Sequence, residues 1–479
     1  MRRLVLIAAA AAVLVVSCGP QDVTPPEVVS VTPVDGSGSV RLDVPFKVEF
    51  SEPLALASFA AGSVTFEVGG QKLDVEVEQG GNAQTMLIRA IQQPRQLPAT
   101  ATVSLTAAIK DRVGNPLQPY SWSFELADWI ALGEVINQDP NEDAENFSLA
   151  WFAGPVLAWS EQEGAAPTIF IARWDDSTSS WVRLGETLDI VRADAASHPK
   201  LRVVDGRLNV VWNEVDSRSH HAVYHAVWTA DGWSYTPQQL NHDTQRNAYV
   251  PVVTRSGAMR AVWFEKSSRT YYGVWSGYDG SGWSAGPDFA TSAQHAYACS
   301  ATNAKGELWV AYKVRDISTY VTTWDGSSWQ SRGQPDGDGL GTSRSQCVRL
   351  ASDSGENVYA AWYEANAWKE YVARWDGAAW SLMGSGALGS AAVIPAMASI
   401  RGELFIAYAD EVRQGGTRVF VARWDPIASS WQELGGPVSR SGSIIEIDLT
   451  SDGAWPLVAW TEDDGGVWLL RAARYNHIQ

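Results

Sequence analysis

Apolar and polar residues alternate along much of this 479-residue chain, as they do in β-strands with one buried and one exposed face. "VRLDVPFKVEFSEPL" (residues 40–54) shows the alternation clearly. "TATVSLTAAIKDRVGNPLQPYSWSFEL" (residues 100–126) predicts a strand, a Gly-Asn-Pro turn and a final strand. With turn residues every 8–12 positions, this part of the chain predicts an antiparallel sandwich of about 100 residues.

From residue 128 onward the chain repeats with a period of about 50 residues, which is typical of propellers and arrays. No repeat shows the 3.6-residue periodicity of a helical solenoid. The first landmark is an apolar strand that ends in an aromatic residue: Trp159, Trp212, Trp263, Tyr312, Trp362, Tyr408 and Trp460. The second is an aromatic residue at a turn: Trp174, Trp228, Tyr278, Trp324, Trp375, Trp424 and Tyr475. The third is a Trp that begins another strand: Trp181, Trp233, Trp283, Trp329, Trp380 and Trp431.

The third landmark is absent from the seventh repeat, and Trp129 in "DWIALGEV" supplies it from the front of the chain. This fragment is similar to "SWVRLGETL" (residues 180–188). A ring whose last sheet borrows a strand from its first segment leaves only short unpaired edges. We therefore predict an all-β chain: an Ig-like β-sandwich followed by a seven-bladed β-propeller, which is closed by its N-terminal strand within residues 128–136.

The first module resembles the bacterial Ig-like domain of the SbsA type. The resemblance rests on "PPEVVSVTPVDG", "VEFSEPL", "KDRVGNPL" and "SWSFEL". It implies a spacer or adhesion unit of bacterial surface proteins, without catalytic residues. The predicted domains are a lipoprotein signal peptide (1–18), a tether (19–24), the Ig-like domain (25–127) and the propeller (128–479).

The "WDGxxW" turns of the repeats resemble the Asp-box turns of sialidase-type propellers. The Ser or Thr expected two residues before the Asp is usually Arg here, with Thr323 as the exception. The resemblance implies the turn and the propeller fold, and we do not extend it to the activity.

The N-terminus, "MRRLVLIAAAAAVLVVSC", carries two Arg residues and an apolar run that is too short to span a bilayer comfortably. It predicts an export signal. "VVSC" resembles the lipobox of bacterial lipoproteins, in which Cys18 is lipidated and anchors the chain in the membrane. The alternatives are an ordinary signal peptide with an incidental Cys and an uncleaved anchor. Gly19, in place of the Asp that retains many lipoproteins in the inner membrane, favours the outer membrane or cell surface.

The net charge of −18 and the lack of basic clusters argue against binding to nucleic acid. Motifs for catalysis and cofactors lack their structural context. "GWSAG" (282–286) occupies the third landmark, and "GSGALG" (384–389) opens no helix. His220, His221 and His225 have no further placed ligand, so we predict no metal site. We expect a monomer without a cofactor.

Most of the 24 Trp residues occupy landmark positions and are most simply packing residues. Trp368, in the loop "YEANAWKEY", does not, and it is a candidate ligand contact. Six repeats carry an acid two residues after the first landmark, and these acids are further candidates: Glu161, Glu214, Glu265, Glu364, Asp410 and Glu462. The alternatives are a loop aromatic that covers its own blade and strand-end acids that accept local hydrogen bonds.

Cys299 and Cys347 begin neighbouring repeats and remain as a pair once Cys18 is lipidated. Since export places them in an oxidising compartment, they are candidates for a disulfide between blades. Two buried free thiols are the alternative.

We expect a non-catalytic surface lipoprotein whose propeller binds a glycan or a protein, with the Ig-like domain as spacer. The alternative is an exported carbohydrate-active enzyme, a sialidase-like hydrolase or lyase. Glycoside hydrolysis needs a positioned acid and a second carboxylate or Tyr. No blade shows such a set standing apart from the repeat. A structural component of the envelope is a third alternative.

Overall fold

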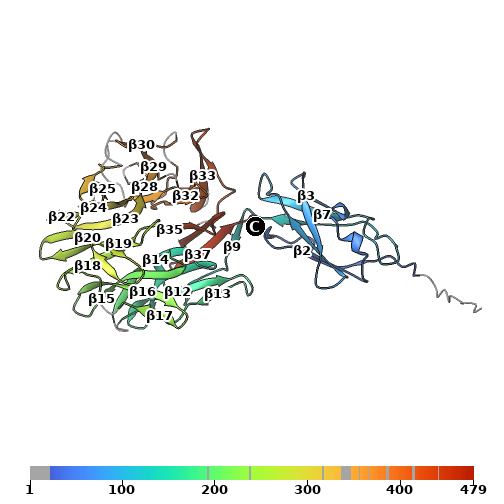
Figure 1. Cartoon of the computed structure of the whole chain (residues 1–479), viewed down its shortest axis with the longest axis horizontal. Helices are drawn as coiled ribbons and strands as arrows, with labels where there is room; N and C mark the ends of the chain where they lie inside the picture. Colours follow the sequence, from blue (N-terminus) through green and yellow to red (C-terminus); the bar gives the residue numbers. More distant parts are fainter. Residues whose placement is uncertain are drawn as a thin grey trace, which may run out of the picture. The chain divides into compact units, whose positions relative to one another are not determined.

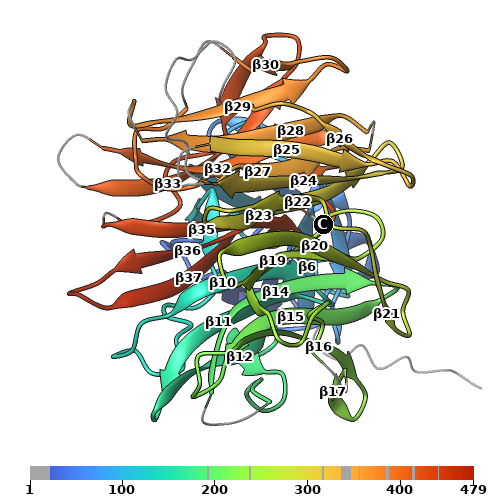
Figure 2. The same cartoon turned by 90° about the vertical axis from the view of Figure 1, so that its left-hand side faces the viewer.

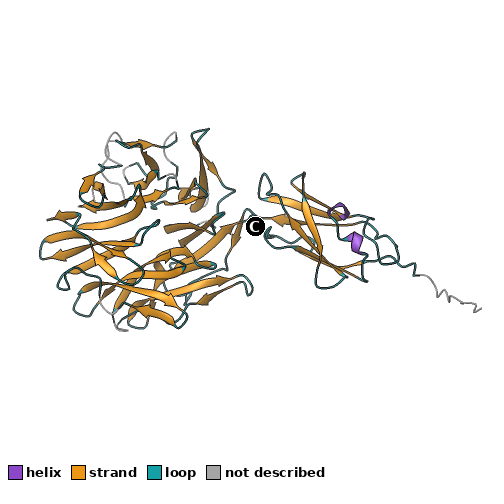
Figure 3. Ribbon diagram, viewed as in Figure 1, coloured by secondary structure: helices purple, strands orange, loops and turns teal. Residues whose placement is uncertain are grey.

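A computed structural model describes residues 22–190, 194–236, 239–314, 318–335, 347–354, 356–365, 367–384, 388–412, 416–440 and 442–478. The chain divides into unit 1, Met1–Ala127 with His477–Gln479, and unit 2, Asp128–Asn476 (Figure 1). Strands build both units, and the helical elements of the described residues are two 3-10 turns in unit 1, Leu56–Ser58 and Ala61–Ser63 (Figure 3). The prediction of an all-β chain is confirmed. Among the described residues, no helix has the length and apolar character needed to cross a membrane.

The described residues of unit 1 form two four-stranded antiparallel sheets. One has the order β1 (Val28–Thr32), β2 (Phe46–Phe50), β6 (Thr85–Ala90), β5 (Val75–Gln79). The other has the order β4 (Gln71–Leu73), β3 (Val64–Val68), β7 (Ala99–Leu105), β8 (Tyr120–Leu126).

The core of unit 1 follows from the alternation in its sequence. In β3 the first, third and fifth residues are buried, and β2 repeats this pattern. The Phe46 ring lies 5.3 Å from that of Phe66 and 5.1 Å from that of Phe124, in tilted and edge-on contacts. Ile478 packs against the same core, and its N–H donates to Gln93 Oε1 at 3.1 Å.

The described residues of unit 2 form seven sheets, which we number in chain order, and each has an antiparallel path of four strands. Sheet 1 is β10 (Glu145–Trp151), β11 (Pro155–Glu163), β12 (Ala166–Asp175) and β13 (Ser180–Arg183). Sheet 2 is β14 (Ala195–Val204), β15 (Arg207–Val215), β16 (His221–Thr229) and β17 (Gly232–Tyr235). Sheet 3 is β18 (Asn247–Val253), β19 (Arg260–Ser267), β20 (Thr270–Tyr278) and β21 (Trp283–Ala285), with β22 (Ala290–Ser292) also paired to β20.

Sheet 4 is β23 (Ala296–Ala304), β24 (Glu307–Val314), β25 (Ser318–Trp324) and β26 (Trp329–Ser331). Sheet 5 is β27 (Arg349–Ser352), β28 (Val358–Glu364), β29 (Lys369–Trp375) and β30 (Trp380–Leu382). Sheet 6 is β31 (Ala396–Ile400), β32 (Glu403–Glu411), β33 (Thr417–Asp425) and β34 (Ser430–Glu433). Sheet 7 is β35 (Ile444–Ser451), β36 (Pro456–Asp463), β37 (Trp468–Tyr475) and β9 (Trp129–Ala131).

The first strands of the seven sheets lie next to one another in a cycle. Each contacts the first strand of the following sheet, and β35 of sheet 7 contacts β10 of sheet 1. In Figure 2 the first strands β10, β14, β23 and β35 lie toward the inside of unit 2, and the last strands β17, β21 and β30 lie toward its outside. Apolar side chains of neighbouring sheets form the cores between them, as Leu457 and Ala459 of sheet 7 do with residues of sheet 1.

The predicted pairing of the front fragment with the end of the chain is confirmed. Trp129 lies opposite Tyr475 in the β37–β9 ladder, and the two rings are 5.4 Å apart. The Trp129 side chain is 8% exposed, and its indole N–H donates to the carbonyl O of Leu434 in the preceding sheet at 3.0 Å.

The same indole link recurs in other sheets. Trp181 donates to Leu132, Trp233 to Leu184, Trp329 to Pro287 and Trp380 to Arg332, over distances of 2.7, 2.7, 3.2 and 2.8 Å. Each bond joins the last strand of one sheet to the carbonyl just after the last strand of the preceding sheet. This explains why the third landmark is a Trp, since the indole supplies both apolar surface and one N–H donor.

Candidate functional site

A cavity of about 300 Å³ lies between the first strands, and all seven sheets contribute to its wall. It therefore collects residues that are far apart in the sequence, from Phe147 to Ser451. A second cavity shares Arg349, Glu446 and Ile447 with the first, and it adds residues from the beginnings of the first strands: Glu145, Asn146, Ile394 and Ile445.

One register position of the first strands gives the cavity its chemistry. In every sheet it is the residue paired with the one just before the first-landmark aromatic. Its occupants are Ser148, Lys200, Val252, Ser300, Arg349, Ala396 and Asp448. All except Ala396 line the cavity. The landmark aromatics repeat from sheet to sheet whereas this position does not, so the cavity departs from the symmetry of the scaffold.

Three of these residues hold neighbouring first strands together. The Ser148 hydroxyl accepts the backbone N–H of Leu201, and the Ser300 hydroxyl accepts that of Leu350, each at 3.0 Å. Asp448 Oδ2 accepts the N–H of Leu149 at 3.0 Å, which joins sheet 7 to sheet 1. A polar acceptor at this position thus bonds the next strand, whereas a Lys or Arg has no acceptor to offer.

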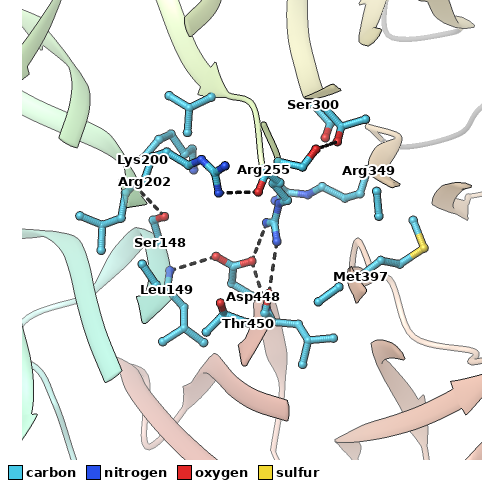
Figure 4. Close-up of a pocket in the computed structure, with 18 of the residues that line it drawn as sticks. Ser148, Leu149, Lys200, Arg202, Arg255, Ser300, Arg349, Met397, Asp448 and Thr450 are labelled. Carbon is cyan, nitrogen blue, oxygen red and sulfur yellow. Dashed lines mark hydrogen bonds and ion pairs between the residues drawn. The ribbon is translucent and has the colours of Figure 1, made fainter. Parts of the chain in front are cut away.

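Asp448 also forms an ion pair across the cavity. Its Oδ1 lies 2.6 Å from Nη2 of Arg255, in the turn that follows β18, and the Asp448 side chain is 11% exposed (Figure 4). Burial alone would raise the pKa of Asp448, but Arg255, the Leu149 N–H and Arg349 together hold it below the ordinary value. Asp448 is therefore an ionised, fully engaged carboxylate.

Lys200 and Arg349 lack such partners. The side chain of neither residue makes a hydrogen bond or an ion pair in the part of the chain that the structure describes, and the Arg349 Nε is buried without an acceptor. Burial lowers the pKa of both groups, and the nearby Glu446 and Asp448 carboxylates oppose this shift. Figure 4 shows Lys200 and Arg349 extending into the cavity from opposite sides.

Glu446 lies two residues before Asp448 on β35, so both side chains leave the same face of that strand. It accepts the Phe147 N–H at 3.3 Å. Burial raises the pKa of Glu446 more than Lys200 and Arg349 lower it. The cavity thus holds two carboxylates whose environments displace their pKa values in opposite directions.

The six candidate acids from the sequence are placed differently. Glu161 accepts the Trp159 indole N–H at 2.7 Å and the backbone N–H groups of Gln138 and Asp139 at 2.9 and 2.6 Å. Indoles two residues earlier also donate to Glu214, Glu265 and Glu462. Asp410 accepts the Ser390 hydroxyl at 2.5 Å. Glu364 is buried at the end of its strand.

None of these acids lines either cavity among the described residues. Burial raises the pKa of Glu161 and Glu265, which fits their place beneath the loops. The geometry favours the local role, in which the acid fixes its aromatic neighbour and the loop between two sheets, over contact with a ligand.

Trp368 is 61% exposed in the turn between β28 and β29 and adopts a φ of +53°. Its ring lies 6.4 Å from that of Tyr363. The turn lies at the same end of sheet 5 as the beginning of β27, because β28 runs antiparallel to β27. Ligand contact by Trp368 stays a prediction.

The remaining candidates are placed as follows. Cys299 and Cys347 are joined by a disulfide with Cα atoms 5.2 Å apart. His225 is buried between Thr236 and Asn209, and burial lowers its pKa to about 4. The predicted lipidation site, Cys18, lies outside the described residues.

Unit 1 contains a group that the sequence did not indicate. Carboxylate oxygens of Asp22, Glu52 and Asp111 lie within 4.8 Å of one another. Asp111 Oδ1 accepts three backbone N–H groups of its own turn, from Val113, Gly114 and Asn115. These bonds account for the burial of Asp111 in the turn.

Sequence reasoning missed Lys200, Arg349, Arg255, Glu446 and Asp448. A signal for three of them was present, since Lys200, Arg349 and Asp448 occupy a first-strand position at which the charge changes from repeat to repeat. It was hidden because that position lies 11 to 13 residues before the aromatic landmark, as the intervening turns differ in length.

Residues 22–125 match the family described as the bacterial Ig-like domain. No curated protein matches the chain. Solved structures with some similarity include the Trypanosoma rangeli sialidase (11% identity, TM-score 0.39), which covers 63% of this chain. This chain spans 57% of that sialidase.

Two further structures are an Aleuria aurantia lectin in complex with Fucα1-6GlcNAc and an ulvan lyase from a new family of polysaccharide lyases. The lectin shares 14% identity, covers 62% of this chain and 96% of its own, and has a TM-score of 0.38. The lyase shares 12% identity, covers 70% and 94%, and has a TM-score of 0.48. TM-scores below 0.5 at such identities do not indicate a shared activity or ligand.

Proposed function

We propose that this chain is an exported, lipid-anchored binding protein of the bacterial outer membrane or cell surface. Its seven sheets form a seven-bladed β-propeller that binds a glycan in the central cavity without transforming it. Its Ig-like domain, residues 25–127, is a spacer between the membrane anchor and the propeller, residues 128–479.

The observation that carries the binding role is the central cavity itself. Residues from one register position of six of the seven sheets converge there, and this position differs from sheet to sheet. A wall that served packing alone would repeat as the landmark aromatics do. A ligand without sevenfold symmetry needs such an asymmetric wall.

The size and lining of the cavity favour a glycan over a folded protein. A volume of about 300 Å³ is at the lower end of small-ligand sites, whereas protein interfaces are broad and bury about 800 Å² on each partner. Hydroxyl groups of Ser148, Ser300, Thr302 and Thr450 line the wall and suit the hydroxyl groups of a sugar.

The proposed location at the membrane rests on the N-terminal sequence and on the Ig-like domain. Lipidation of Cys18 with two or more acyl chains would hold the chain firmly at a membrane. Metabolic labelling with a radioactive fatty acid should mark the wild-type chain and not Cys18→Ser. Equal labelling of both would contradict a lipoprotein.

The binding role is tested with the purified full chain in detergent on a glycan array. Val252→Phe places a larger side chain at the cavity wall, and Val182→Phe makes the same change at an exposed position of β13. We expect Val252→Phe to lose bound glycans and Val182→Phe to keep them. Because Val252 is buried, Val252→Phe should melt at a lower temperature, and a cooperative melting transition in both variants checks that they fold. Binding that survives Val252→Phe unchanged, or no glycan binding at all, would contradict the proposal.

A carbohydrate-active enzyme is the second candidate, and one observation favours it. Glu446 and Asp448 lie side by side with pKa values displaced in opposite directions, the arrangement of an acid and an ionised carboxylate. Against it, Asp448 is held by Arg255 and the Leu149 N–H. Hydrolysis or elimination of a bound glycan that Glu446→Gln abolishes would establish the enzyme; binding without turnover supports the binding protein.

A further inference from the structure

Positive charge collects in the central cavity of a strongly acidic chain. Four cationic side chains line it, Lys200, Arg202, Arg255 and Arg349, against two acidic ones, Glu446 and Asp448. The whole chain carries a net charge of −18. Cationic side chains in a cavity lose part of their hydration, which costs free energy. An anion that binds in the cavity would offset this cost, because it would pair with the excess positive charge.

Two of the four cations already have partners. Arg202 donates to the carbonyl groups of Arg255 and Gly257 at 2.6 and 3.1 Å. Arg255 is paired with Asp448. The side chains of Lys200 and Arg349 make no hydrogen bond and no ion pair among the described residues, so these two cations are the ones free to bind a counter-charge.

Glu446 does not neutralise them directly. No ion pair within 4.0 Å joins it to Lys200 or Arg349 in the described part of the chain, although its charge acts on both pKa values. The strand brings the carboxylate near the two cations without contact. All three residues line the same cavity of about 300 Å³.

One end of the cavity is spanned by the turn between β18 and β19, residues 254–259. Thr254 forms a parallel bridge to Ala301 of the next first strand. Hydrogen bonds of the turn reach the walls of four other sheets, at Arg202, Asn303, Ser352 and Asp448. No other turn between a first and a second strand makes such bonds to four other sheets among the described residues.

The opposite end lies at the beginnings of the first strands. The second cavity is located there, lined by Glu145, Asn146, Ile394 and Ile445, and it meets the first cavity at Arg349 and Glu446. Since the turn of residues 254–259 spans the far end, this end is the way in. Trp368 lies at the same end of sheet 5.

We propose that Lys200 and Arg349 form an oxyanion site that binds the acidic terminal sugar of a glycan, which enters past Glu145 and Ile394 and ends against the turn of residues 254–259. The inference rests on the proposed function and names its ligand class. An Arg guanidinium binds a planar carboxylate or a sulfate through two N–H groups, and a Lys supplies a second point charge from the other side. Because the far end is spanned, the site takes a chain end and not the middle of a chain.

The test measures binding to the full chain in detergent by isothermal titration calorimetry. The probes are glucuronate, glucose 6-sulfate, inorganic sulfate and glucose. We expect glucuronate or glucose 6-sulfate to bind, whichever oxyanion the site prefers, and glucose to bind at least tenfold more weakly. Lys200→Met and Arg349→Met should each weaken binding of the acidic sugar about tenfold to a hundredfold, the effect of losing a charge-assisted hydrogen bond.

Exposed cations of unit 2 give matched controls, Lys305→Met and Arg269→Met, which should bind as the wild type does. Lys200→Arg should recover most of the affinity. The chain-end requirement is tested with a trisaccharide that ends in glucuronate and with the same chain extended by one neutral sugar beyond the glucuronate. The extension should abolish binding.

Equal binding of glucose and glucuronate, no binding of either acidic sugar, or undiminished affinity in both Met variants would overturn the inference. Tight binding of inorganic sulfate with none of the sugars would show a free-anion site and also overturn it. If glycans bind to the wild type on the array and bind equally well to Lys200→Met and Arg349→Met, the proposed function is supported and this inference is wrong. If nothing binds on the array, both fall.

Discussion

Replacing Trp129 with Ala should destabilise unit 2, because this residue belongs to the strand that completes sheet 7. The side chain is 8% exposed, packs on Tyr475 and donates to Leu434. Truncating a buried Trp to Ala typically costs about 3–5 kcal/mol, including the lost contacts. With an unfolding entropy of roughly 2.1 cal/mol/K per residue over about 350 residues, the melting temperature should fall by about 4–7 °C.

Differential scanning fluorimetry gives the measurement, and Trp233→Ala is the matched control. Trp233 occupies the same landmark in sheet 2, whose strands are consecutive in the chain, and it donates to Leu184 at 2.7 Å. If β9 is an integral strand, the two variants should lose comparable stability. A Trp129→Ala protein that melts within 1 °C of wild type, beside a Trp233→Ala protein that loses several degrees, would refute the closure by β9.

Three further predictions concern stability. Glu161→Ala removes the acceptor of one indole and two backbone N–H groups, so we expect the free energy of unfolding to fall by about 3 kcal/mol or more while calorimetric ligand affinity is unchanged; lost affinity at full stability would instead make Glu161 a ligand contact. Since burial raises the pKa of Glu446, the folded state holds that proton more tightly than the unfolded chain, and wild-type stability falls as pH rises above about 4.5 through the folded pKa. Glu446→Gln has no proton to lose at this position, so its melting temperature relative to that of the wild type should rise as the pH increases through this range. A difference in melting temperature that stays constant from pH 4 to pH 8 would contradict the raised pKa of Glu446. Cys299 and Cys347 close a loop with a sequence separation of 48, so reduction should cost roughly 2–4 kcal/mol, and non-reducing peptide mass spectrometry should recover the linked pair; two alkylated thiols in the unreduced protein would exclude the bond.

The repeated landmarks predicted the architecture because they are the residues that build it. An aromatic residue at the end of the second strand recurs in all seven repeats. A Trp that begins the last strand recurs beside it, and in five sheets its indole bonds the preceding sheet. The absence of one Trp from the last repeat was therefore enough to assign Trp129 to that sheet. The short strand β22, Ala290–Ser292, was not predicted, since three residues without a landmark leave no pattern.

The candidate site was harder to predict for the same reason. The strand-end acids attracted attention because they recur, and recurrence reflects their bonds to the landmark indoles. Lys200 and Arg349 do not recur, and each is ordinary in its own segment. They stand out only in the structure, where their side chains make no ion pair whereas Arg255 pairs with Asp448, 193 residues away in the sequence. Pairing across a ring of sheets leaves no local trace in a sequence.

The place of β9 has a consequence for the order in which the polypeptide matures. Trp129 is made long before Tyr475, its neighbour in the finished ladder. At about 5–20 residues per second, synthesis of the intervening segment takes roughly 20–70 s. During that interval an apolar strand edge is exposed, which invites association with other nascent chains. A chain that lacks β37 should therefore be an aggregation-prone product in which β9 is unpaired, and not merely a shorter one.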